Sequence, residues 1–71
     1  MKGLGIGRVV HFYRPTVDQS VGEPQAAIVT RLSEKDGNVE VTVFPGGEVF
    51  SEVPFAKSPT PYSWSWPPKA E

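Results

Sequence analysis

Three β-rich runs separated by short turn signals constrain the fold of this chain most. Gln25–Leu32 and Val39–Phe44 flank Asp36-Gly37, a dipeptide that favours a tight hairpin turn. Pro45-Gly46-Gly47 then turns the chain into Glu48–Val53. The run Val39–Phe44 alternates apolar and polar residues, which is the pattern of a half-buried strand. The sequence therefore predicts an antiparallel meander over residues 25–53.

Alternation also predicts which side chains face the core. Val39, Val41 and Val43 would point inward, because successive side chains of a strand point to opposite faces. In the next run, residues 48–53, Val49 and Val53 would share one face with Ser51, and Phe50 would lie on the opposite face.

Two further segments complete an all-β domain spanning residues 1–71. Arg8–Tyr13 is rich in β-branched and aromatic residues and predicts a first strand. Residues 14–25 contain Pro and Gly without a helical period, so they predict a long loop. Five of the eight prolines fall within residues 54–68, and the tail 54–71 is expected to be an edge strand or polyproline-like segment wrapped over the barrel. Four or five short strands without a helix of normal length favour a small SH3-like barrel or meander over an OB-like one.

The size of the chain bears on how it is stabilised. A domain of 71 residues is near the lower limit for folding alone. Cysteine is absent, which excludes disulfides and thiolate metal sites, and the single His11 cannot form a zinc site alone. A chain this small often buries surface against copies of itself, so a homo-oligomer is favoured. No catalytic residues, metal site or cofactor are predicted.

The charge and hydropathy of the chain exclude several classes of partner. Seven Lys or Arg and eight Asp or Glu give a net charge of −1, a poor electrostatic match for duplex nucleic acid. Residues 1–7 are too short and too interrupted by glycine for a signal peptide. No apolar run approaches the length of a membrane span, so we expect a soluble intracellular protein.

The aromatic tail Tyr-Ser-Trp-Ser-Trp-Pro-Pro at residues 62–68 is the main candidate for a binding site. In an extended backbone Tyr62, Trp64 and Trp66 would form one row, which either closes a small core or builds a ligand wall. Rings stack bases, and guanidinium groups bind phosphate. His11 is either a hydrogen-bonding group for a ligand or a partly buried structural histidine. The candidate ligand-binding residues are Arg8, His11, Tyr13, Arg14, Arg31, Tyr62, Trp64 and Trp66.

Four short motifs carry a resemblance to a protein family. They are Gly-Arg-Val-Val-His at 7–11, Ala-Ala-Ile-Val at 26–29, Val-Thr-Val-Phe at 41–44 and Trp-Ser-Trp-Pro at 64–67. With these motifs the chain resembles small proteins encoded in tailed-phage and prophage genomes, which open with a Gly-Arg-Val-Val-like strand and end with a Trp-x-Trp-Pro signature. The resemblance spans most of the chain. Members often carry histidine between the tryptophans, where this chain has Ser65, so no histidine role is carried over.

The resemblance implies a non-enzymatic phage accessory protein that binds a partner. The leading hypothesis is an anti-defence protein that sequesters a nucleotide-type immune signal between subunits in the host bacterial cytoplasm. Tyr13, Trp64 and Trp66 would then stack the base, and the arginines would bind phosphates. The alternative is a virion decoration, assembly or protein–protein interaction module that docks on a host or phage protein. A single-stranded nucleic-acid binder is the third hypothesis, and the bulk charge argues against it.

Overall fold

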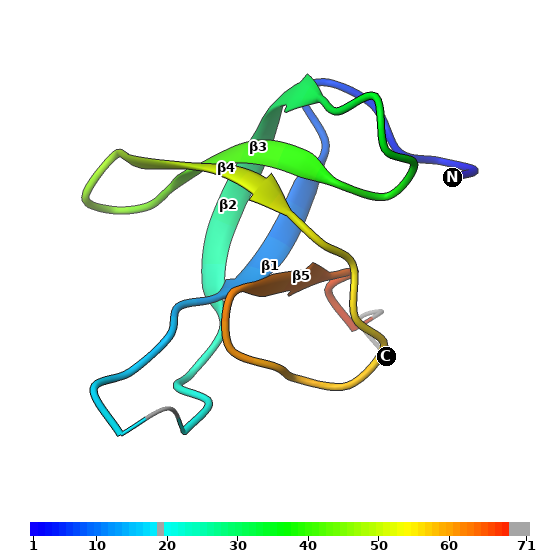
Figure 1. Cartoon of the computed structure of the whole chain (residues 1–71). Coiled ribbons are helices and arrows are strands. Elements are labelled where there is room, and N and C mark those ends of the chain that lie inside the picture. Colours follow the sequence, from blue (N-terminus) through cyan, green and yellow to red (C-terminus); the bar gives the residue numbers. More distant parts are fainter. Residues whose placement is uncertain (19, 69–71) are drawn as a thin grey trace.

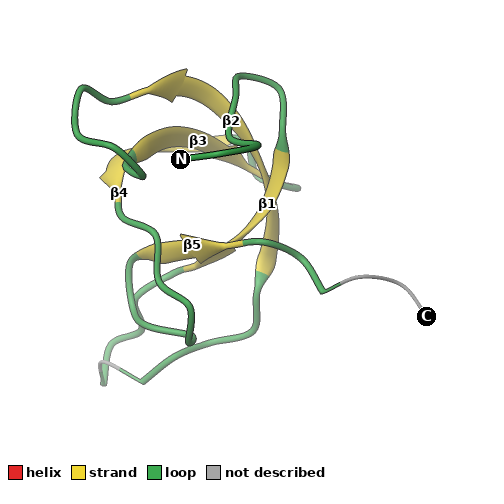
Figure 2. Ribbon diagram, turned by 90° about the vertical axis from the view of Figure 1, so that its right-hand side faces the viewer, coloured by secondary structure: helices red, strands yellow, loops and turns green. Residues whose placement is uncertain are grey.

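The computed structural model describes residues 1–18 and 20–68, and its secondary structure consists of short strands. The strands are β1 (Val9–Tyr13), β2 (Gln25–Leu32), β3 (Val39–Val43), β4 (Glu48–Val53) and β5 (Ser63–Ser65). All paired strands are antiparallel, and their order in the sheet is β4-β3-β2-β1-β5. The sheet curls into a half-barrel (Figure 1, Figure 2). Its buried side chains form one apolar core. The predicted all-β class, a small SH3-like barrel or meander, is confirmed.

Residues 54–56, which follow β4, pair with β5 at the open side of the half-barrel. The backbone N–H of Trp64 donates to the carbonyl of Pro54 at 3.0 Å, and the N–H of Ala56 donates to the carbonyl of Trp64 at 3.0 Å. Phe55 and Trp64 accordingly form a parallel bridge. β5 therefore has backbone partners on both sides, β1 on one and residues 54–56 on the other. This pairing places residues 54–56 and β5 of the predicted tail against the body of the barrel, whereas residues 69–71 of that tail lie outside the described residues.

The core consists of the inward residues of the strands. The prediction for β3 is confirmed, because Val39, Val41 and Val43 are all buried. On β1 the buried positions alternate in the same way as far as Phe12, and Tyr13 is buried as well. The fully buried cluster comprises Val10, Phe12, Ala27, Val29, Val39, Val41, Val43, Val53 and Trp64.

The faces of β4 differ from the prediction. Phe50 packs against the core and stacks on Phe12 with ring centroids 4.7 Å apart, whereas Val49 is 58% exposed. Val53 is also buried, so Phe50 and Val53 face the same side although they are three residues apart.

A β-bulge explains this reversal. Val39 pairs with Val53 and Val41 pairs with Phe50, so three steps along β4 oppose two steps along β3. Glu52 has a positive φ of 51°, which turns the backbone within the bulge. The assignment of Val49 and Val53 to one face was wrong because it assumed an uninterrupted alternation.

The connections follow the predicted turns. Gly37, with φ of 89°, lies in the β2–β3 turn, and Gly47 donates its N–H to the carbonyl of Val43 in the β3–β4 turn. Within the long loop between β1 and β2, Pro15 and Val21 form an isolated antiparallel β-bridge. Within residues 1–18 and 20–68, no helix has the length and apolar character needed to cross a membrane.

Candidate ligand-binding site

Trp64 belongs to the core. Its side chain has no solvent exposure, and its Nε1–H donates to the buried carbonyl of Gly37 at 2.7 Å. Its ring packs edge-to-face on Phe55 and on Trp66, with centroids 5.0 and 5.1 Å apart. Of the two interpretations of this tryptophan, the structure supports the closed core. Trp64 therefore cannot stack a ligand as the candidate list proposed, because other side chains already cover its ring.

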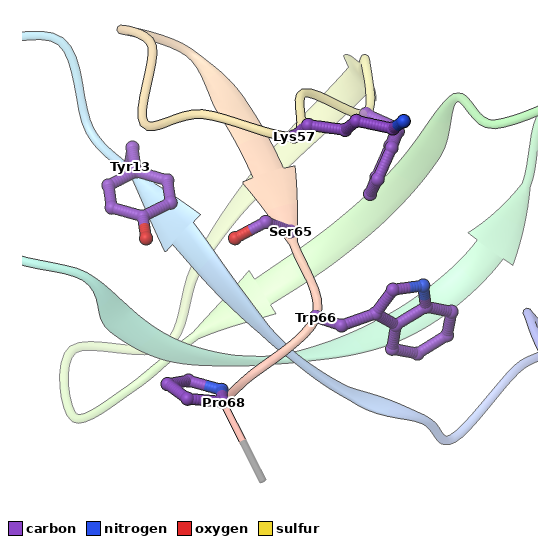
Figure 3. A pocket seen from close by; sticks show the side chains of 6 residues that line it. Tyr13, Lys57, Ser65, Trp66 and Pro68 are labelled. Carbon is purple, nitrogen blue, oxygen red and sulfur yellow. The ribbon is translucent and has the colours of Figure 1, made fainter.

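Trp66 lies just beyond the end of β5 and is half-buried. Its ring stands at 89° to that of Trp64, and the indole is labelled in Figure 3. The guanidinium carbon of Arg8 lies 5.8 Å from the centroid of the Trp66 ring. Trp66 is therefore the tryptophan that a ligand can reach, and Arg8 is the arginine beside it.

Tyr62 does not continue the predicted aromatic row. It has a positive φ of 57°, so the backbone is not extended there and the strand begins at Ser63. Its ring packs edge-to-face on Phe12 and Phe50, with centroids 5.9 and 6.1 Å apart, and its hydroxyl donates to the carbonyl of Ser51. Tyr62 thus packs on Phe12 of β1 and Phe50 of β4, and not on the two tryptophans.

Two surface hollows meet at Trp66. The first, here called the Tyr13 hollow, has a volume of about 320 Å³ and is shown in Figure 3. Its lining residues are Tyr13, Phe55, Lys57, Ser65, Trp66 and Pro68. The second, here called the Arg8 hollow, has a volume of about 400 Å³. It is lined by Gly7, Arg8, Val9 and Trp66, so Trp66 is a lining residue common to both hollows.

Strand pairing accounts for the composition of the Tyr13 hollow. Tyr13 pairs with Ser63, and His11 pairs with Ser65, so Tyr13 and Ser65 are diagonal neighbours on adjacent strands. Tyr13 is 8% exposed and so reaches the hollow with little of its surface. Lys57 follows the stretch 54–56 that bridges to β5. The sequence did not single out Lys57, because a lone lysine in a proline-rich tail gives no local signal of that long-range pairing.

The three arginines of the candidate site do not converge. Arg8 and Arg14 flank opposite ends of β1, and Arg31 lies on β2 in register with Glu40. Arg14 forms an ion pair with Glu48, and its guanidinium carbon lies 5.4 Å from the ring centroid of Phe50. Only Arg8 among them lines a hollow together with Trp66.

Arg14 is largely occupied by its protein partners. Its Nε donates to the side-chain oxygen of Gln25 at 3.2 Å, and its two terminal nitrogens donate to the carboxylate of Glu48. The hydrogen bond and charge of Arg14 hold the pKa of the Glu48 carboxyl below its ordinary value. A third hollow of about 360 Å³ beside Arg14 is therefore lined by a guanidinium that is already paired.

His11 lies in the middle of β1, between Ala26 of β2 and Ser65 of β5. It is half-buried and lines neither of the hollows at Trp66. In the described part of the chain, no group of three or more His, Cys, Asp or Glu side chains is placed to hold a metal ion.

Comparison with known proteins adds no further constraint. No family model, curated protein or solved structure matches this chain.

Proposed function

We propose that the protein is a non-enzymatic binding protein that captures a small planar anion of the nucleotide class at Trp66. The observation that carries the proposal is the pairing of an accessible indole with the guanidinium of Arg8 at 5.8 Å. Stacking of a base on an aromatic side chain contributes about 1–3 kcal/mol, and a guanidinium binds phosphate through two parallel hydrogen bonds. An indole and a guanidinium together therefore suit a ligand that has both a flat ring and a negative charge.

Both groups are held in place by the protein before a ligand arrives. Trp66 packs on Trp64, and Trp64 is fixed by its hydrogen bond to Gly37. The Nε of Arg8 donates to the carbonyl of Gly3 at 2.8 Å, which leaves the two terminal nitrogens for an anion. Because 5.8 Å is near the outer limit of a cation–π contact, little is lost when the guanidinium turns toward a phosphate. Preorganisation of this kind lowers the entropic cost of binding.

The biological role in this proposal follows the resemblance to phage-encoded proteins. The protein sequesters a nucleotide-type immune signal in the host bacterial cytoplasm and so acts against host defence. Both hollows at Trp66 are open to solvent, and in this proposal a second copy of the chain covers them. A homo-oligomer that encloses the ligand between subunits is therefore part of the proposal.

Isothermal titration calorimetry of the purified protein against AMP, cyclic AMP and cyclic di-AMP tests this function. We expect a dissociation constant of micromolar order or tighter for at least one of them, about −8 kcal/mol or better. Arg8→Gln is expected to weaken that binding at least about tenfold, because a charge-assisted hydrogen bond is lost. Arg31→Gln is the matched control, since Arg31 lines neither hollow.

Two results would count against the proposal. One is the absence of measurable heat with all three nucleotides at a protein concentration of about 100 μM, because binding that weak could not sequester a signal. The other is an equal loss of affinity in Arg8→Gln and Arg31→Gln, which would show that the effect is not local to Trp66. Circular dichroism spectra of each variant establish that the fold is retained.

A second candidate function, a virion decoration or protein-interaction module, is favoured by one observation on the outer face of the sheet. Val9 pairs with Ile28, Ile28 with Thr42 and Thr42 with Val49, so these residues form a row across β1 to β4. Val9 is 55% exposed and Val49 is 58% exposed. Detection of the protein in purified phage particles, and its loss in Val49→Glu, would select this function.

A further inference from the structure

The Tyr13 hollow contains hydrogen-bond donors that the proposed function does not use. In the part of the chain that the structure describes, no hydrogen bond or ion pair engages the hydroxyl of Tyr13, the hydroxyl of Ser65 or the ammonium of Lys57. No buried side-chain nitrogen or oxygen of the described residues lacks a partner, so the Tyr13 hydroxyl must open to solvent although its ring is almost covered. All three groups can donate a hydrogen bond, and one of them carries a positive charge.

The charges around both hollows have one sign. Among the described residues, the Tyr13 hollow is lined by one lysine and the Arg8 hollow by one arginine, and neither is lined by a carboxylate. Two hydroxyl donors and an ammonium form a suitable set for the oxygens of a phosphate ester. Figure 3 shows the hydroxyl of Ser65 directed toward the side of the strand on which Tyr13 lies, with Lys57 across the strand. The long flexible stem of Lys57 allows its ammonium to move to an anion bound in the hollow.

The shared wall connects the two hollows. Trp66 lines both of them, so a ring stacked on this indole would have the Arg8 hollow to one side and the Tyr13 hollow to the other. We infer that the Tyr13 hollow is a second anion subsite, and that the ligand carries two phosphate-type groups, one bound by Arg8 and one by Tyr13, Ser65 and Lys57. This inference rests on the proposed function, and it narrows the ligand from nucleotides in general to planar compounds with two anionic groups.

Two probes that differ in the number of phosphodiesters test the inference. Cyclic di-AMP has two and cyclic AMP has one. Calorimetry with Arg8→Gln and Lys57→Gln should show at least about tenfold weaker binding of cyclic di-AMP in each variant, because each loses a charge-assisted hydrogen bond. Cyclic AMP should lose affinity in Arg8→Gln and change by less than about twofold in Lys57→Gln. Lys35→Gln is the matched control for Lys57→Gln, because Lys35 lies in the β2–β3 turn and lines neither hollow.

Variants that keep the shape of the hollow separate binding from folding. Tyr13→Phe removes the hydroxyl and retains the ring, and Ser65→Ala removes the second hydroxyl. Each substitution should weaken the binding of cyclic di-AMP more than that of cyclic AMP. The midpoint of urea denaturation should stay near that of the wild type. The expected stoichiometry is one cyclic di-AMP per protein chain, because each chain has one Tyr13 hollow and one Arg8 hollow.

The outcomes distinguish a failure of the second subsite from a failure of the proposed function. If both nucleotides bind and Lys57→Gln, Tyr13→Phe and Ser65→Ala leave every affinity unchanged, the second subsite is refuted while the proposed function stands. A stoichiometry of two cyclic AMP molecules per protein chain, with binding of each lost in a different variant, would confirm the second subsite. It would refute a single ligand that occupies both hollows. If AMP binds but neither cyclic nucleotide does, the inference is refuted and the proposed function stands. If none of the three nucleotides binds, both are refuted.

Discussion

Replacing Trp64 with alanine is expected to remove most of the free energy of unfolding. Trp64 is the largest fully buried side chain, and it packs on Phe55 and Trp66. A core Trp→Ala change costs about 3–5 kcal/mol, and loss of the indole N–H leaves the buried carbonyl of Gly37 unpaired at a further cost of about 1–3 kcal/mol. A domain of 71 residues has only about 4–11 kcal/mol in total, at about 0.05–0.15 kcal/mol per residue.

Urea denaturation followed by far-ultraviolet circular dichroism measures this effect. Fluorescence is less suitable, because the substitution removes one of two tryptophans. With a slope of about 1 kcal/mol per molar urea, the midpoint should fall by about 4 M or more, or the variant should be unfolded in buffer. Trp64→Phe keeps most of the apolar volume but loses the donor, so an intermediate decrease is expected.

Trp66→Ala is the control, because the same type of side chain is removed from a half-buried position next to Trp64. Its decrease in midpoint should be clearly smaller. A wild-type midpoint for Trp64→Ala, or a larger loss for Trp66→Ala than for Trp64→Ala, would refute the assignment of Trp64 to the core and of Trp66 to the site.

Two further predictions concern the bulged strand and the loop between β1 and β2. Phe50→Ala should lower the free energy of unfolding by about 2–3 kcal/mol because Phe50 stacks on Phe12, whereas Val49→Ala should change it by less than about 0.5 kcal/mol. Equal effects in urea denaturation would contradict the assigned faces of β4. Hydrogen bonds from Ser20 and Thr16 lower the pKa of Asp18 from 3.8 to about 2, so the ionised carboxylate stabilises the loop above pH 3.8 and this contribution is lost as the pH falls through about 2. Ser20→Ala should raise that pKa toward 3.8 in an NMR titration, and an unchanged value would show that these hydrogen bonds are not formed.

The strands could be predicted from the sequence because their signals are local. β2 and β4 have the predicted bounds, since β-branched residues and the turns at Gly37 and Gly47 mark where each begins or ends. The faces of β4 could not be predicted in this way. The bulge depends on packing of Phe50 against a distant strand, and Glu52 is not a residue type that signals a positive φ.

The arrangement of the candidate residues in space, as distinct from their role, could be predicted only in part. Tyr13, Trp66 and Arg8 lie together around the two hollows, but Trp64 was not separable from Trp66, because both have the same residue type and would share one face of the tail. The separation of Arg8 from Arg14 follows from strand geometry, since six residues at about 3.3 Å each extend about 20 Å. Lys57 required the long-range bridge between Phe55 and Trp64.

The pairing of β5 with β1 has a consequence for synthesis in the cell. Of the five strands, β1 leaves the ribosome before the others, whereas β5, which pairs with its second edge, leaves after them. A nascent chain interrupted before residue 64 would lack the largest side chain of the interior and would expose an unpaired strand edge. We therefore expect the barrel to close only after β5 has left the ribosome, and products truncated before β5 to be prone to aggregation or proteolysis.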